Sequence, residues 1–248
     1  MNSEYLLVSD LDDTFLGDRA ALHRFAEFYD GIRDCLQIAY ASGRFYETIR
    51  QDVVATPLPE PVAVLGGVGS EIRDFPSGKL DTDWVRQIST NWSASQVRQL
   101  LAADPTLRGT LQLQPEPSQS EFKISYYLDD ATDEQLEHIR SLLAKQGIQV
   151  DLIYSSRQDL DVLPKGVNKG KAAAFIAERL GYPPERVMVS GNSGNDIRLF
   201  EHGFLGIVVA NAHPVLKNNV DANAYLSSEA RADGVRDGIQ HWMLTSKA

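Results

Sequence analysis

Short apolar runs alternate with amphipathic stretches over the first third of the chain. Residues 5–10 (YLLVSD) and 36–44 (LQIAYASGR) are largely apolar, which is typical of strands buried on both faces. Residues 61–72 (PVAVLGGVGSEI) predict a third strand, interrupted by glycines. Between the first two strands, residues 20–32 place apolar side chains at helical spacing. This alternation predicts a parallel sheet covered by helices.

The same alternation returns near the C-terminus. A helix, a strand, a short helix, a second strand and a final helix are predicted at residues 168–181, 186–191, 196–203, 205–212 and 232–242. Together with the N-terminal elements, these segments predict a doubly wound, Rossmann-like α/β core. We expect this core to comprise residues 1–80 and 159–248.

The segment between these two parts, residues 81–158, has a different pattern. Partly alternating strand patterns and two helix patterns follow one another here, at residues 93–104, 110–115, 121–129, 132–147 and 149–156. Strands with half-polar faces are typical of an antiparallel sheet with helices on one side. We therefore predict an inserted α+β domain, with the core resuming at "DLDVLPK".

Composition and charge exclude some classes of function. Hydrophobic residues make up 43% of the 248 residues, and the formal net charge is −10. This charge argues against binding to nucleic acid or to an anionic membrane, both of which need a basic surface. A phosphate site would have to be built locally. The single cysteine, Cys35, and the absence of a basic, apolar leader predict a cytoplasmic protein.

Four polar clusters are predicted at the carboxyl ends of the core strands, the edge where open parallel sheets bind ligands. They are Asp10 with Asp12 and Thr14, then Ser42-Gly43-Arg44, then Lys169, and finally "GNSGND" at residues 191–196. Each cluster alone is common in loops. Together they provide carboxylates, a hydroxyl, an ammonium group and amides, which suits phosphoryl transfer with Mg²⁺. A cation would also relieve the repulsion between Asp10 and Asp12.

These motifs resemble those of the haloacid dehalogenase phosphatase superfamily. The match is closer to its sucrose-phosphate phosphatases, through "SDLDDTFLGD", "YASGR", "GGVGSEI", "FKISYYLD", "DLDVLPKGVNKG" and "SGNSGNDIRLF". The resemblance implies a Rossmann-like core with an α+β cap that selects a sugar phosphate. It also implies hydrolysis through an aspartyl-phosphate, with Mg²⁺ as cofactor.

The resemblance implies a role for each residue of the first motif. Asp10 would be the nucleophile and a metal ligand. Asp12 would be the general acid and base, and its backbone carbonyl would bind the metal. Thr14 would orient the loop. The experiment that tests the first of these roles is Asp10→Asn, which should remove turnover.

The later motifs imply the remaining contacts. Ser42 and Gly43 would hold phosphate oxygens, and Lys169 would steady Asp10 and the transferring group. Asn192 and Asp196 would complete the metal site, and Asn195 would contact the substrate or phosphate. The family usually has Asp where this chain has Asn192. This change is either a neutral loop variant or a cause of altered metal dependence.

Substrate recognition rests on fewer signals. By resemblance, Ser70 and Glu71 from the core and Lys123 from the cap would face the sugar, although Glu71 and Lys123 also suit ion pairs. Arg44 suits either a sugar or phosphate contact or a turn. Tyr126 and Tyr127 suit either stacking on a sugar ring or packing within the cap. Asp159 and Asp161 suit either a hinge or hydrogen bonds within the cap.

The expected function is hydrolysis of sucrose 6-phosphate in sucrose biosynthesis. The alternatives are mannosylfructose phosphate or another sugar phosphate as substrate, or a non-catalytic sugar-phosphate-binding subunit. We expect a small-molecule sugar phosphate as ligand, no nucleic acid or membrane partner, and a monomer. The synthase that makes the sugar phosphate is a candidate partner.

Overall fold

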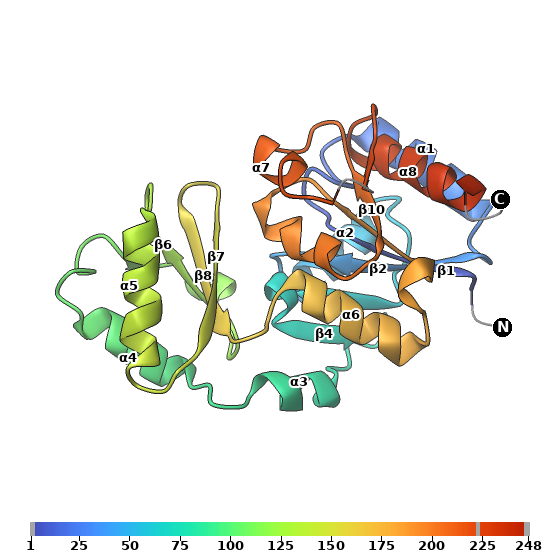
Figure 1. The fold of residues 1–248 in the computed structure, drawn as a ribbon. Coiled ribbons are helices and arrows are strands. Elements are labelled where there is room, and N and C mark those ends of the chain that lie inside the picture. The colour runs from blue at the N-terminus through green and yellow to red at the C-terminus, as the bar shows by residue number, and fades with distance from the viewer. Residues whose placement is uncertain (1–2, 222–223, 246–248) are drawn as a thin grey trace. The chain divides into compact units, whose positions relative to one another are not determined.

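The computed structural model describes residues 3–221 and 224–245. The chain forms two compact units (Figure 1). The core unit comprises Met1–Leu80 and Lys169–Ala248, and the cap unit comprises Asp81–Asn168. No helix in the described ranges has both the length and the apolar character needed to cross a membrane.

The core unit contains a seven-stranded sheet within the described residues. Its order is β11-β10-β9-β1-β2-β3-β4, and only β4 runs antiparallel to its neighbour. The strands are β1 (Tyr5–Ser9), β2 (Leu36–Ala41), β3 (Ala63–Gly66), β4 (Glu71–Asp74), β9 (Val187–Gly191), β10 (Leu205–Val208) and β11 (Tyr225–Leu226). Because β1 lies between β2 and β9, the chain reverses its direction of winding beside β1. Such a switch point is where open α/β sheets bind ligands.

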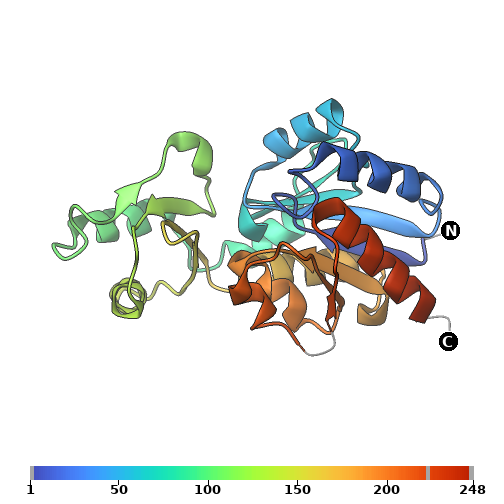
Figure 2. The same cartoon turned by 90° about the horizontal axis from the view of Figure 1, so that it is seen from above.

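Helices cover both faces of this sheet. They are α1 (Arg19–Asp30), α2 (Tyr46–Ala55), α6 (Lys169–Leu180), α7 (Pro214–Lys217) and α8 (Arg231–Thr245), with 3₁₀ segments η1 (Gly67–Gly69), η3 (Pro184–Arg186) and η4 (Gly194–Glu201). Helix α1 packs beside α8, and α6 packs beside η4 (Figures 1 and 2). Arg24 on α1 donates to Asp233 on α8, with Nε 3.1 Å from Oδ1. The centre of the sheet is largely apolar, and Leu6, Leu7 and Val8 of β1 are completely buried.

The cap unit is a four-stranded antiparallel sheet with helices packed on one face. Its order is β5-β6-β8-β7. The elements are α3 (Thr82–Ile88), α4 (Ala94–Ala103), β5 (Gln112–Leu113), η2 (Glu116–Ser118), β6 (Ile124–Tyr127), α5 (Asp133–Ala144), β7 (Val150–Ser155) and β8 (Asp159–Pro164). Alternate strand residues such as Ile124 and Val162 join Val97 of α4 and Ile139 of α5 in one apolar cluster. The period-two pattern of the strands therefore buries one face and leaves polar side chains on the other.

The α/β class and its inserted α+β unit are confirmed, but two predicted boundaries are wrong. The core was expected to resume at residue 159, yet β8 pairs with β6 and β7, so the cap unit extends to Asn168. The alternation in "DLDVLP" belongs to an antiparallel strand with one polar face. Residues 61–72 form a hairpin rather than one strand, because Val68 (φ 61°) and its flanking glycines reverse the chain between β3 and β4.

Candidate active site

Three loops that follow parallel strands bring the predicted core residues together. Asp10 follows β1, Ser42 follows β2 and Asn192 follows β9. Two backbone bonds prolong the strands, from Asp10 N–H to the Ser190 carbonyl (3.0 Å) and from Ser42 N–H to the Leu65 carbonyl (3.0 Å). Since β1 lies between the other two strands, Asp10 occupies the middle of this edge.

The centre of the site is a buried cluster of two carboxylates and one ammonium group. Lys169 Nζ lies 2.7 Å from Asp10 Oδ1 and 2.7 Å from Asp196 Oδ1. Lys169 and Asp196 are 0% exposed and Asp10 is 4% exposed. A third contact links Lys169 Nζ to Asn195 Oδ1 at 3.2 Å. The predicted proximity of Lys169 to Asp10 is therefore present in the folded chain.

Burial and charge shift the pKa values of this cluster. Burial raises the pKa of Asp10 to about 7, with a further rise from the Asp196 carboxylate, and Lys169 and Thr14 only partly oppose the rise. Burial by itself would lower the pKa of Lys169, but Asp10 and Asp196 outweigh it and raise that pKa above its usual range. One ammonium group faces two carboxylates, so the cluster has a net negative charge when both carboxylates are ionised.

Close packing explains how Lys169 and Asp196 meet. A Cβ atom at Gly170 would lie 1.9 Å from the Arg198 carbonyl oxygen, so only glycine lets α6 approach η4 this closely. Asp196 Oδ2 accepts from the backbone N–H groups of Asn192 and Ser193, each at 3.0 Å. Asp196 thus holds the loop after β9 with one oxygen and Lys169 with the other.

Asp196 and Asn195 both have hydrogen-bond partners within the protein. Asp196 is predicted to bind metal, and each of its carboxylate oxygens accepts hydrogen bonds in this structure. Asn195 was expected to contact substrate, and its side-chain oxygen accepts from Lys169 and from Ser193 Oγ at 3.0 Å. Both side chains therefore contact Lys169, and their metal and substrate contacts stay predictions.

The loop after β1 is held at Asp10, Thr14 and Asp13. Thr14 Oγ1 donates to Asp10 Oδ2 at 2.8 Å, so each oxygen of Asp10 has one partner. Asp13 adopts a left-handed conformation (φ 56°), and its carboxylate pairs with Arg231 Nη2 at 3.0 Å. Asn211 Nδ2 donates to the Asp13 carbonyl at 2.7 Å. The sequence contained no spacing that would have linked Asp13 to α8.

The side chain of Asp12 points to another neighbour. It is 61% exposed, and its Oδ2 lies 3.0 Å from Arg44 Nε. Arg44 also donates from Nη1 to Asp52 on α2 at 2.5 Å, a contact that the sequence analysis missed. Ser42 Oγ accepts from the Arg44 backbone N–H at 3.1 Å, beside Gly43.

Ser70 and Glu71, from the predicted third strand, lie beside the loop after β2. Glu71 Oε1 accepts from the Tyr46 backbone N–H at 2.7 Å, at the start of α2, and Oε2 pairs with Arg73 at 3.0 Å. Ser70 is 2% exposed, and within the described structure its hydroxyl has no hydrogen-bond partner. Gly67 N–H donates to the Arg44 carbonyl at 3.0 Å, which joins this hairpin to the loop after β2.

In the cap unit, Lys123 forms a buried ion pair. Its Nζ lies 3.4 Å from Asp161 Oδ1, and the two side chains are 7% and 14% exposed. Ser125 Oγ donates to the same Asp161 oxygen at 2.6 Å. Burial raises the pKa of Asp161, and Lys123 partly opposes the rise. Tyr126 packs in the apolar cluster under the helices, as its packing alternative predicted.

The donor set of the core site suits a divalent cation. Asp10 supplies a carboxylate, Asp12 a backbone carbonyl and Asn192 an amide, and Mg²⁺ prefers such oxygen ligands while retaining several waters. The negative charge of the two ionised carboxylates also favours a bound cation. Within residues 3–221 and 224–245, no three His, Cys, Asp or Glu side chains cluster as a metal site. A metal here would therefore need carbonyl, amide and water oxygens in addition to the Asp10 carboxylate.

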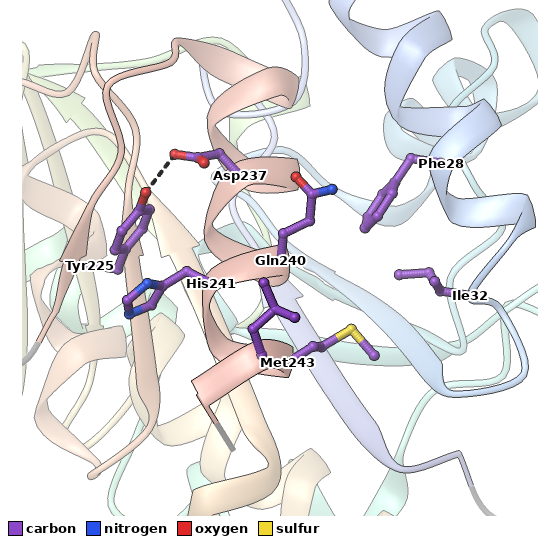
Figure 3. Close-up of a pocket in the computed structure, with 8 residues that line it drawn as sticks. Phe28, Ile32, Tyr225, Asp237, Gln240, His241 and Met243 are labelled. Carbon is purple, nitrogen blue, oxygen red and sulfur yellow. Dashed lines mark hydrogen bonds between the residues drawn. The ribbon is translucent and has the colours of Figure 1, made fainter. Parts of the chain in front are cut away.

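A separate groove of about 600 Å³ lies at the far ends of α1 and α8 (Figure 3). Phe28, Tyr225 and His241 are among its lining residues, and Tyr225 donates to Asp237 at 2.9 Å. Both helices begin near the loop after β1, where Arg231 meets Asp13, and run away from it. The groove is thus remote from Asp10 and brings together none of the predicted site residues.

Comparison with known proteins relates this geometry to a family. The family model for sucrose-6F-phosphate phosphohydrolase matches residues 3–243. The chain belongs to that family. It therefore has the haloacid dehalogenase fold that the motifs predicted, and its named relatives are phosphatases.

Individual relatives cover nearly the whole chain. Mannosylfructose-phosphate phosphatase of Agrobacterium fabrum is 32% identical, with 98% of each chain covered. The sucrose-phosphatase of Synechocystis, solved with sucrose and phosphate, is 34% identical with a TM-score of 0.88, covering 98% of this chain and 99% of that one. A probable sucrose-phosphatase of Arabidopsis thaliana is 30% identical over 96% of this chain, which spans only 60% of that longer protein.

Proposed function

We propose that this protein hydrolyses sucrose 6-phosphate to sucrose and phosphate through an aspartyl-phosphate on Asp10. The observation that carries the proposal is the buried Asp10, bonded to Lys169 and Thr14 at the carboxyl end of the central strand. Membership of the sucrose-6F-phosphate phosphohydrolase family supports the substrate.

The residues of the core unit suit each step. Asp10 attacks phosphorus, and Asp12 donates a proton to the sugar oxygen as the phosphorus–oxygen bond breaks. Asp12 then accepts a proton from the water that attacks the aspartyl-phosphate, which releases phosphate and restores Asp10. Lys169 holds Asp10 in place, and Ser42, Gly43 and Lys169 are proposed to hold phosphate oxygens.

Phosphatases of this superfamily generally depend on Mg²⁺, and we propose the same here. The ion would be held by Asp10, the Asp12 carbonyl and Asn192, with Asp196 completing the metal site. When bound, Mg²⁺ would neutralise charge on the transferring phosphoryl group. We also propose that the protein works as a cytoplasmic monomer, with the synthase of its sugar phosphate as a candidate partner.

Sugar selection is assigned to the hairpin after β3 and to the cap unit. Ser70 has a buried hydroxyl without a partner in the described structure, which suits a ligand hydroxyl. Glu71 and Arg44 are already paired within the core unit, and Lys123 with Asp161 in the cap unit. These three would have to exchange partners to contact a sugar.

Mannosylfructose phosphate is the second candidate substrate. The observation that favours it is the 98% mutual coverage and 32% identity with mannosylfructose-phosphate phosphatase. Its chemistry is the same, so Asp10 and Asp12 keep their roles and only the sugar contacts change. A non-catalytic role is disfavoured, because a binding subunit has no need of a buried nucleophile held by both a lysine and a threonine.

A substrate panel tests the proposal. Phosphate release is measured from sucrose 6-phosphate, mannosylfructose phosphate, glucose 6-phosphate, fructose 6-phosphate and 4-nitrophenyl phosphate, with Mg²⁺ and with a chelator. We expect the highest kcat/KM with sucrose 6-phosphate and loss of activity on chelation. A preference for mannosylfructose phosphate would move the substrate assignment alone. An absence of release from all five would contradict the enzymatic proposal.

Asn192 provides a prediction about the metal. Asn192→Asp replaces a neutral amide ligand with a carboxylate, so we expect the half-saturating Mg²⁺ concentration to fall by roughly tenfold. The measurement is the Mg²⁺ dependence of phosphate release. Asn218→Asp, an equal charge change at an exposed position after α7, serves as the control. An unchanged Mg²⁺ requirement in Asn192→Asp would mean that Asn192 is a neutral loop variant.

A further inference from the structure

Arg44 connects two carboxylates that come from different elements. Its Nη1 donates to Asp52 Oδ2 at 2.5 Å, and its Nε lies 3.0 Å from Asp12 Oδ2. Asp52 is on α2, whereas Asp12 is in the loop after β1. A guanidinium group is a planar fork, so fixing one of its nitrogens also fixes the direction of the others.

The backbone of Arg44 is fixed as well. Its N–H donates to Ser42 Oγ at 3.1 Å, and its carbonyl accepts from Gly67 N–H at 3.0 Å. The side chain is 27% exposed, and its Nε and Nη2 are buried without a hydrogen-bond partner in the described structure. With the backbone held between β2 and η1 and Nη1 held by Asp52, the guanidinium lies beside Asp12 as an ion pair, with Nε 3.0 Å from Oδ2.

Asp12 needs such a contact more than its neighbours do. Asp10 is locked by Lys169 and Thr14, and Asp13 is paired with Arg231 from α8. The Asp12 side chain is 61% exposed, and within the described residues it forms an ion pair with Arg44. The backbone of the loop is therefore held by other residues, while the direction of the Asp12 carboxylate depends on Arg44.

We propose that Asp52 and Arg44 form a positioning pair that orients the Asp12 carboxylate for proton transfer to the leaving group. The inference rests on the proposed function, in which Asp12 is the general acid. It assigns a role to Asp52, and it changes the role of Arg44 from a sugar or phosphate contact to a residue that acts through Asp12. Holding Asp12 in one orientation lowers the barrier for the two steps in which it moves a proton, protonation of the leaving oxygen and deprotonation of the attacking water.

The charges around Arg44 favour this role over phosphate binding. Two carboxylates already neutralise its guanidinium, and an anionic phosphate would have to displace one of them. A phosphate contact would mainly affect substrate binding and hence KM. A positioning role would mainly affect the rate at which the leaving group is released in the first turnover, and only for leaving groups that need protonation, since the later hydrolysis step is the same for every substrate.

Two aryl phosphates test this distinction without reference to the sugar. Phenolate is a poor leaving group that needs a proton, whereas 4-nitrophenolate leaves readily without one. In Asp52→Ala, we expect the first-turnover rate of phenol release from phenyl phosphate to fall by about 10-fold to 100-fold, part of what a general acid contributes. We expect the first-turnover rate of 4-nitrophenol release to fall by less than about 3-fold, and the substrate concentration that gives half of the maximal first-turnover rate to stay the same for both.

Further variants separate positioning from folding. Arg44→Lys keeps the charge but lacks the fork, so it should give the same leaving-group dependence as Asp52→Ala. Asp52→Asn keeps an acceptor oxygen and should recover part of the activity with phenyl phosphate. Glu47→Gln serves as the matched control, since Glu47 is an exposed carboxylate on the same helix that pairs with Arg50. It should leave both rates and the melting temperature unchanged.

Each outcome decides the proposal. Equal losses of the first-turnover rate with both aryl phosphates, or weaker substrate binding with an unchanged first-turnover rate, would overturn the positioning role. A leaving-group dependence in a protein that shows no preference for sucrose 6-phosphate would support the positioning pair and contradict the proposed substrate. If the wild-type protein released phosphate from neither aryl phosphate nor any sugar phosphate, both proposals would fail.

Discussion

Replacing Asp10 with asparagine removes the nucleophile, and we expect phosphate release from every substrate to fall by roughly 10³-fold or more. The amide fits the same space, its oxygen can still accept from Lys169 and its NH2 can donate to the Thr14 hydroxyl, so the fold should be retained. The reason for the loss is chemical: an amide oxygen is a poor nucleophile and forms no stable acyl-phosphate. The measurement is the rate of phosphate release from sucrose 6-phosphate and from 4-nitrophenyl phosphate.

A second measurement identifies the covalent step. Beryllium fluoride mimics an aspartyl-phosphate and should bind the wild-type protein with Mg²⁺ but not Asp10→Asn. The control is Asp34→Asn, which makes the same change at an exposed loop position. Substantial turnover by Asp10→Asn would contradict the assignment of the nucleophile.

Replacing Lys169 with methionine should damage both stability and activity. The change leaves Asp10 and Asp196 buried without their shared ammonium group, and removing one partner of a buried ion pair typically costs roughly 3–5 kcal/mol. Activity should fall by at least about 10²-fold, because Asp10 is no longer held and the transferring phosphoryl group loses a positive charge. Denaturant unfolding and phosphate release measure the two effects.

Two further variants make this result specific. Lys171→Met changes an exposed lysine two positions along the same helix, and we expect its stability and activity to match the wild type. Lys169→Arg keeps the positive charge but has a longer, planar head group, so it should recover more stability than activity. Wild-type unfolding and turnover in Lys169→Met would show that the buried cluster has neither role.

The predicted site was most accurate where the residues follow strands directly. Asp10, Ser42 and Asn192 each stand just after an apolar run, and parallel strands necessarily bring their carboxyl ends to one edge. Lys169 was expected near Asp10 by resemblance, and Nζ does lie 2.7 Å from its carboxylate. By contrast, the sequence could not show that Asp196 would use both oxygens inside the protein, because that depends on the close approach of α6 and η4 at Gly170.

The cap boundary shows a limit of pattern reading. The alternation in β8 fits an antiparallel strand of the cap as well as an edge strand of the core, and pairing with β6 and β7 decides between them. The hairpin of β3 and β4 is similar. Glycines marked a break in the apolar run, but the reversal depends on Val68 adopting a positive φ while its N–H bonds to the Ser42 carbonyl.

By itself, the sequence determined the α/β class, the insertion, the family and the strand-end residues of the site. These depend on local patterns, since periodicity, turn residues and short motifs are contained within a few consecutive positions. Only the tertiary structure decided which charged groups meet. These ion pairs join segments that lie far apart in the chain, or a loop and the helix that follows it. They are Arg44 with Asp12 and Asp52, Arg231 with Asp13, and Lys169 with two carboxylates. Such pairs follow from how the elements pack, which no spacing along the chain specifies.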